Sequence, residues 1–172
     1  MELGTGILVS FLYWHYGLSW ELAMVAFYCC LFLTLLIIDL EQGILPNKIV
    51  YPGMIIALIL SLVAEPGIKD AAIGGGIGLS LLLIPALIYR GGMGWGDVKL
   101  AGLIGLVTGF PNVFIAIFLA IFSGGLVAAI LLLLKIKNRK EAIPFGPFLA
   151  LAAMATLIWG EQILIWYLSF LR

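Results

Sequence analysis

Two aspartates lie at the ends of apolar segments, where an ionisable side chain is costly and usually has a function. Asp39 closes one apolar run, in LLIIDLEQGILPN, and Asp97 opens another, in GGMGWGDVKLAG. If the two carboxylates lie close together, they cannot both ionise cheaply and share one proton. Such a pair activates water and protonates a leaving amine, as in aspartic proteases, and needs no metal ion or other cofactor. The competing interpretation is that each is only a helix-terminal residue, since Asp97 would suit a first helical turn.

A run of glycines precedes the second aspartate. Gly91, Gly92, Gly94 and Gly96 stand directly before Asp97, and the run is not expected to form ordinary helix because each glycine costs roughly 1 kcal/mol there. Without Cβ atoms, Gly94 and Gly96 would let a substrate strand lie directly on the backbone. A phosphate-binding loop is the competing interpretation, but the run follows no predicted strand and no Lys-Ser/Thr pair follows it.

Two polar residues near these segments have two interpretations each, and two cysteines have one. Glu41 could attract a basic substrate segment or be a solvated loop residue. Lys99 could pair with an acidic group of the substrate or hold Asp97 in place. Cys29 and Cys30 are adjacent in an apolar run with no C-x-x-C spacing, which predicts packing residues and no zinc site.

The composition requires these residues to be positioned by membrane-spanning elements. Of the 172 residues, 64% are apolar and 10% are charged, whereas soluble domains average about 45–50% and about 25%. This excludes a soluble enzyme, and nine basic residues against nine acidic ones leave no net charge to attract a nucleic acid. Seven helices of about 20 residues each would use nearly the whole chain, so residues 1–172 are expected to form a single integral-membrane domain.

Apolar runs and turn residues predict an all-α polytopic bundle of about seven helices, some of them short or re-entrant. The runs are long and lack the alternation of a membrane β-barrel. Small residues four apart, such as Gly74 and Gly78, or Ala101 and Gly105, predict close contact between helices. The expected ranges are 3–18, 22–40, 49–64, 71–89, 98–108, 113–134 and 148–171.

Basic residues predict how the bundle is oriented. If the N-terminus is cytoplasmic and all seven segments cross, the outer side holds only two of the basic residues, Lys69 and Arg172. Both aspartates then lie on the cytoplasmic side. The cytoplasmic side then holds Lys48, Arg90, Lys99, Lys135, Lys137, Arg139 and Lys140.

Three blocks of sequence, in this order and spacing, resemble the type IV prepilin peptidases. They are DLEQGILPNKIVYPG, which contains Asp39, then GMGWGDVKLAG with the G-x-G-D signature, then IPFGPFLA at residues 143–150. The resemblance implies that Asp39 and Asp97 match the two catalytic aspartates. The presenilin group also has G-x-G-D, but its Pro-Ala-Leu motif follows that signature, whereas residues 85–87 precede it here. That group also has Tyr before its first aspartate, where this chain has Ile38.

The resemblance also implies a substrate, a location and a missing activity. Family members cleave the short basic leader from type IV prepilin or pseudopilin precursors after a glycine, at the cytoplasmic face of the inner membrane. Many also methylate the product through an N-terminal C-x-x-C segment. The chain begins about where that segment would end, so it is expected to cleave without methylating, either as a natural short form or as part of a longer enzyme.

A second class of function remains open from the sequence. A non-proteolytic membrane scaffold, or a small proton- or ion-coupled transporter, could use Asp39 and Asp97 as an ion site. The glycine run favours the protease, because a carrier needs no such run beside an interfacial aspartate. The expected partners are the prepilin substrate and the lipid bilayer, without nucleic acid, and the oligomeric state is not determined.

Overall fold

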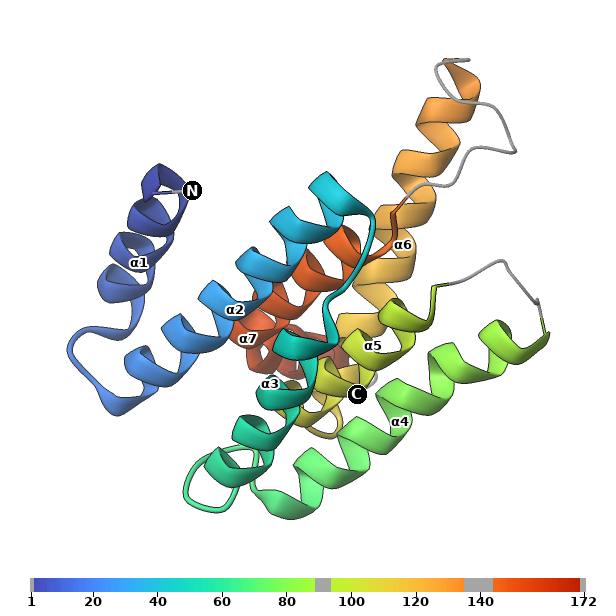
Figure 1. Cartoon of the computed structure of the whole chain (residues 1–172). Helices are drawn as coiled ribbons and strands as arrows, with labels where there is room; N and C mark the ends of the chain where they lie inside the picture. Colours follow the sequence, from blue (N-terminus) through green and yellow to red (C-terminus); the bar gives the residue numbers. More distant parts are fainter. Residues whose placement is uncertain (1, 89–93, 135–143, 171–172) are drawn as a thin grey trace.

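The computed structural model describes residues 2–88, 94–134 and 144–170, and in those ranges it contains helices and no strand. The class predicted from the sequence, an all-α polytopic membrane protein, is confirmed (Figure 1). The expected positions Gly91 and Gly92 lie outside the described residues, as do the cations Arg90, Lys135, Lys137, Arg139, Lys140 and Arg172. Within the described part, the helices are α1 (Glu2–Tyr16), α2 (Trp20–Gln42), α3 (Asn47–Leu60), α4 (Ile68–Ile88), α5 (Trp95–Thr108), α6 (Asn112–Leu133) and α7 (Gly146–Phe170).

The helices fall into two length classes. Among the described residues, α2, α4, α6 and α7 are long and apolar enough to cross a membrane. The other three have 14 or 15 residues. At about 1.5 Å per residue they rise about 21–23 Å, less than the roughly 30 Å of a hydrocarbon core. The expectation of short segments therefore holds.

Turn residues set the helix ends, and most of the expected boundaries move by between one and four residues. Gly17, with φ 61°, ends α1 before position 18. Residues 61–64 form turns, so α3 stops at residue 60. The change that bears on the site is at α5, which begins at Trp95 instead of 98, so that Gly96 is helical. The expectation that the whole glycine run avoids helix was wrong at Gly96, because tertiary packing outweighs the low helix propensity of one glycine.

The connection between α2 and α3 is a short corner built from two residue types. Gly43 adopts the left-handed conformation, with φ 64°, and its N–H bonds the carbonyl of Asp39, which is the usual way a glycine ends a helix. Pro46 then stands immediately before α3 in an extended conformation. The α2–α3 corner therefore follows directly after Asp39.

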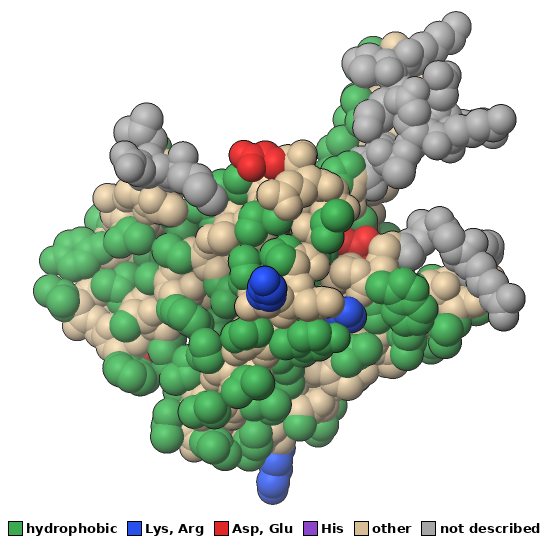
Figure 2. Space-filling view, in the orientation of Figure 1, with side chains coloured by type: hydrophobic (Ala, Val, Ile, Leu, Met, Phe, Trp, Pro, Cys, Tyr) green, Lys and Arg blue, Asp and Glu red, His purple; other side chains and the backbone are tan. Residues whose placement is uncertain are grey.

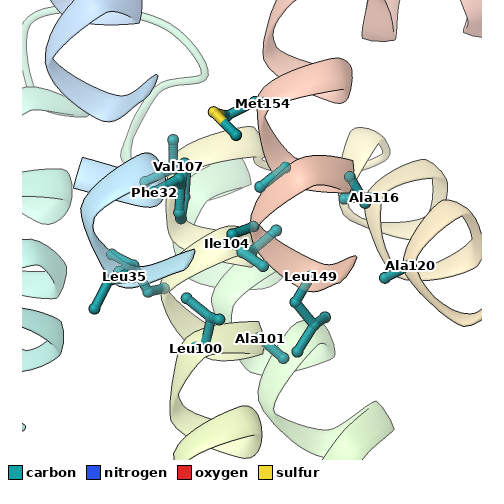
Figure 3. Close-up of a cluster of buried hydrophobic side chains, with 14 of the residues drawn as sticks. Phe32, Leu35, Leu100, Ala101, Ile104, Val107, Ala116, Ala120, Leu149 and Met154 are labelled. Atoms are coloured by element: carbon teal, nitrogen blue, oxygen red, sulfur yellow. The ribbon is translucent and has the colours of Figure 1, made fainter. Parts of the chain in front are cut away.

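The short helix α5 lies at the centre of the bundle. It packs against α3, α4, α6 and α7, and nine of its residues are buried. Side chains of α2, α6 and α7 meet those of α5 there (Figure 3). Hydrophobic side chains cover much of the face shown in Figure 2, as expected for contact with lipid. The labelled core residues are Phe32 and Leu35 of α2, Leu100, Ala101, Ile104 and Val107 of α5, Ala116 and Ala120 of α6, and Leu149 and Met154 of α7.

The predicted small-residue contact joins α4 to α5. A Cβ built on Gly105 would lie 2.5 Å from the carbonyl carbon of Gly74, and one built on Gly78 would lie 3.1 Å from that of Ala101. Backbone therefore touches backbone at both places, which only residues without bulky side chains allow.

We expect Gly105→Ala to destabilise the protein, because the added methyl group would force the backbones of α4 and α5 apart. Overpacking of this kind costs about 1–3 kcal/mol. Gly76→Ala is the matched control, since a Cβ there meets nothing within 4 Å and alanine is the better helix former. Thermal unfolding in detergent measures both. Equal melting temperatures for the two variants would contradict the close packing.

Candidate active site

Asp39 is buried although it carries an ionisable group. It lies in the last turns of α2 with 5% of its surface exposed, and its Oδ2 has no hydrogen-bond partner among the described residues. Phe32, Leu35 and Asp39 are spaced three and four apart, so they share one face of the helix. Because this face of α2 packs into the core, the Asp39 carboxylate is buried together with the two apolar side chains.

Asp97 occupies the first turn of α5, three residues after Gly94, which precedes the helix. Its N–H donates to the carbonyl of Gly94 at 3.1 Å. The N–H of Gly94 is in turn directed at the Asp97 carboxylate. A carboxylate is favoured here because the first turn of a helix presents unpaired N–H groups and a partial positive charge. Asp97 is only partly buried, so this carboxylate is the more accessible of the two.

The two aspartates come together although they are far apart in the sequence. Asp39 lies within electrostatic range of the Asp97 carboxylate. The residue that connects their surroundings is Leu45, in the α2–α3 corner, which is 7% exposed. Its Cβ would lie 3.0 Å from a Cβ built on Gly96, and its Cδ1 3.4 Å from one built on Gly146. We call this part of the bundle, defined by Asp39, Leu45, Asp97 and Gly146, the aspartate end.

Gly146 forms the third side of the site. It belongs to the block IPFGPFLA that carries the family resemblance, but the sequence assigned this glycine no role of its own. It is the first residue of α7, and its N–H is directed at the Asp39 carboxylate. A Cβ built on Gly146 would lie 2.9 Å from Asp39 Cγ and would overlap Oδ2. The available signal was its place before Pro147, because proline is favoured in the first turn of a helix. Nothing local could indicate that the aspartate of α2 packs against this glycine.

The other expected site residues separate into two groups. Gly94 is exposed beside Asp97, as a surface for substrate requires, whereas Gly96 is covered by Leu45. Glu41 is exposed in the last turn of α2. Lys99 donates from Nζ to Asn47 Oδ1 at 2.9 Å and lies 5.2 Å from the ring centre of Tyr51. Lys99 therefore connects α5 to α3, and in the part of the chain that is described no ion pair joins it to Asp97.

The thiols and the possible metal ligands lie apart. Cys29 is buried and Cys30 half-buried, and neither forms a disulfide. Across residues 2–88, 94–134 and 144–170, no three His, Cys, Asp or Glu side chains come together as a metal site would need. The chemistry that the described site offers is that of two carboxylates and backbone N–H groups.

Fold and site together define a class: a polytopic helical membrane protein whose two interacting carboxylates lie at one end of the bundle. The sequence model of the type IV leader peptidase family matches residues 25–130, a segment that includes both aspartates. The chain belongs to this family.

Curated relatives match this sequence along nearly the whole chain. The prepilin leader peptidase/N-methyltransferase of Stutzerimonas stutzeri is 31% identical over 178 residues, which covers 100% of this chain and 62% of the relative. Proteins of the same name from Pseudomonas aeruginosa and Pseudomonas putida are 33% and 34% identical, over 99% and 95% of this chain and 61% and 59% of theirs. The chain thus spans about three fifths of the length of these relatives. No solved structure matches it.

Proposed function

We propose that the protein is an aspartic endopeptidase that removes the short basic leader from type IV prepilin or pseudopilin precursors, cutting after a glycine. One observation carries the proposal. A buried carboxylate on α2 and a partly accessible one on α5 lie within electrostatic range of one another at one end of a largely apolar bundle. Burying a charge costs free energy. A catalytic role, in which the pair shares a proton and acts on a peptide bond, accounts for a carboxylate being kept there despite that cost.

In the proposed reaction, the ionised carboxylate of the pair takes a proton from water, whose oxygen attacks the scissile carbonyl carbon. The protonated carboxyl gives its proton to the carbonyl oxygen. The newly protonated carboxyl then gives its proton to the amide nitrogen, while the other carboxylate takes a proton from a hydroxyl of the tetrahedral intermediate. The carbon–nitrogen bond breaks, which releases an acid and an amine and leaves one shared proton on the pair. Asp39 and Asp97 are the catalytic residues of this scheme.

Three neighbouring residues are the candidates for holding the substrate. Gly94 is exposed and its backbone lies against Asp97, because a Cβ built there would be 3.2 Å from Oδ2. An extended substrate strand could therefore approach the carboxylates over Gly94. Glu41 is exposed two residues beyond Asp39 and would attract the basic leader. Lys99 would act from the α3 side, where its ammonium is already fixed by Asn47.

The aspartate end is proposed to face the cytoplasm. Lys48 lies in the first turn of α3 and Lys99 lies in α5 two residues after Asp97, whereas Lys69 lies in the first turn of α4, which follows the other end of α3. Lysine and arginine are concentrated on the cytoplasmic side of membrane proteins. This orientation would bring the pair to the face where a basic leader is available before export.

We expect Asp39→Asn and Asp97→Asn each to reduce prepilin cleavage by several orders of magnitude. Asparagine keeps the volume but cannot share or transfer a proton, so the transition state loses its proton donor and acceptor. Cleavage of a purified prepilin in liposomes measures the loss, and thermal unfolding verifies that each variant folds. Substantial cleavage by either folded variant would refute the pair.

Gly146→Ala is expected to lower cleavage by at least about a hundredfold, because its methyl group would displace the Asp39 carboxylate, and small misplacements of reacting groups cost about that much. The matched control is Gly125→Ala in α6, where a Cβ meets nothing within 4 Å. The same cleavage assay applies. Wild-type rates in folded Gly146→Ala would show that Asp39 does not need its present position.

Orientation is testable with single cysteines. We expect Lys48→Cys to react with a membrane-impermeant maleimide only from the cytoplasmic side, and Lys69→Cys only from the opposite side, because both positions are exposed at opposite ends of α3. The unsubstituted chain controls for Cys30. Labelling of position 48 from outside in intact cells would reverse the proposed orientation.

A further inference from the structure

A polar cavity lies at the end of the bundle away from the aspartates. It has a volume of about 460 Å³ and is enclosed by α1, α2, α5, α6, α7 and the α3–α4 connection. Glu21, on its wall, lies about 27 Å from Asp39 along the axis of α2, at 1.5 Å per residue. Figure 1 shows the start of α2 at the opposite end of that helix from the aspartate end. We call it the distal cavity, and the residues that matter are Tyr16, Glu21, Thr108, Asn112, Thr156 and Glu161.

Thr156 is the first sign that the distal cavity binds something. Only 3% of the residue is exposed, and its Oγ1 has no hydrogen-bond partner in the described structure. A buried hydroxyl without a partner is costly, and a helical threonine can usually avoid that cost by donating to a carbonyl three or four residues earlier. Hydroxyls that do so here are those of Ser10, Thr34, Ser61, Ser80, Thr108, Ser123 and Ser169.

Asn112 provides a second unpartnered acceptor in the same place. Its Oδ1 is buried and has no hydrogen-bond partner within the described ranges. A Cβ built on Gly160 would lie 3.1 Å from Cγ2 of Thr156 and 3.5 Å from Oδ1 of Asn112, so both side chains border the space that this glycine leaves open. Asn112 Oδ1 of α6 and Thr156 Oγ1 of α7 thus lie in one small region, and each could accept a hydrogen bond from a bound molecule.

The charges around the cavity indicate which donor fits. Glu21, Glu65 and Glu161 line it and are exposed, and no lysine or arginine is among its described lining residues. The carboxylates of Glu21 and Glu161 both act electrostatically on the hydroxyl of Tyr16. They do not converge on a metal site. A negative field spread over the opening favours an organic cation that brings its own N–H groups.

We propose that the distal cavity binds a primary ammonium group, carried by the head group of a membrane aminolipid. The ammonium would donate to Asn112 Oδ1 and Thr156 Oγ1, with the glutamates supplying the compensating charge. The lipid is favoured over a free amine because the cavity opens at an end of the membrane-spanning helices. Trp20, on its wall, is 65% exposed, as is usual for residues at the head-group level. The inference does not depend on the peptidase proposal.

The test compares two lipids that differ in their N–H groups. We expect native mass spectrometry of the full chain to show saturable binding of phosphatidylethanolamine, and at least about fivefold weaker binding of phosphatidylcholine, whose quaternary ammonium donates no hydrogen bond. Equal binding of both lipids would overturn the proposal. Soluble ethanolamine separates the two sources: competition at the same concentration as the lipid would overturn the assignment to a lipid.

Variants locate the site. Thr156→Val should weaken phosphatidylethanolamine binding at least about fivefold, and Thr156→Ser, which keeps the hydroxyl, should restore it. Thr108→Val is the matched control, because this threonine lines the same cavity but already donates to Ile104 at 2.9 Å. Glu161→Gln changes an exposed residue, so it tests the charge even if Thr156→Val fails to fold. Thr156→Val and Thr108→Val with equal affinity, or unchanged affinity in Glu161→Gln, would place the lipid elsewhere.

Discussion

The contact on which the rest of the structure depends is the meeting of backbones between α4 and α5. Gly74 and Gly105 face one another with no room for a Cβ on either. Lipid tails are as apolar as the helices, so the hydrophobic effect does little to hold helices together inside a membrane, and close packing must do so. Because α4 approaches so closely, α5 can be short and still be enclosed on its other sides by α3, α6 and α7. The position of Asp97 follows from the position of α5.

The site itself depends on three helix ends arriving at one place. The last turns of α2 bring Asp39, the first turn of α5 brings Asp97, and the first residue of α7 is Gly146. Two of these ends are helix N-termini, whose N–H groups and partial positive charge favour a carboxylate. Gly94 and Gly146 both direct backbone N–H groups at the aspartates, so backbone rather than cationic side chains offsets much of the cost of burial. A cation fixed beside the pair would hold both carboxylates ionised and oppose the sharing of a proton.

The sequence alone was sufficient for features that are local. Runs of apolar residues and turn residues indicate helices wherever they occur, and an aspartate in such a run is conspicuous because of its cost. Contacts between distant segments leave no such trace. The packing of Gly146 against Asp39, and of Leu45 on Gly96, exists only once α2, α5 and α7 are assembled, and packing also explains why Gly96 is helical. In the sequence, Thr156 is an ordinary small residue. Only the structure shows that its hydroxyl lacks the hydrogen bond to an earlier carbonyl that other serine and threonine hydroxyls of the bundle make.

The place of α7 bears on how much of the chain the proposed peptidase needs. The family match covers residues 25–130 and stops before this helix, although both aspartates lie inside it. Yet α7 packs against α2, α5 and α6, and its first residue packs directly against the Asp39 carboxylate. Without it, the face of α2 that carries Phe32, Leu35 and Asp39 would lie open to lipid, and the carboxylate would lose its backbone N–H. The segment that holds the two aspartates is therefore not enough to position them. The same helix contributes Thr156 to the distal cavity, so α7 shapes both polar regions of the bundle.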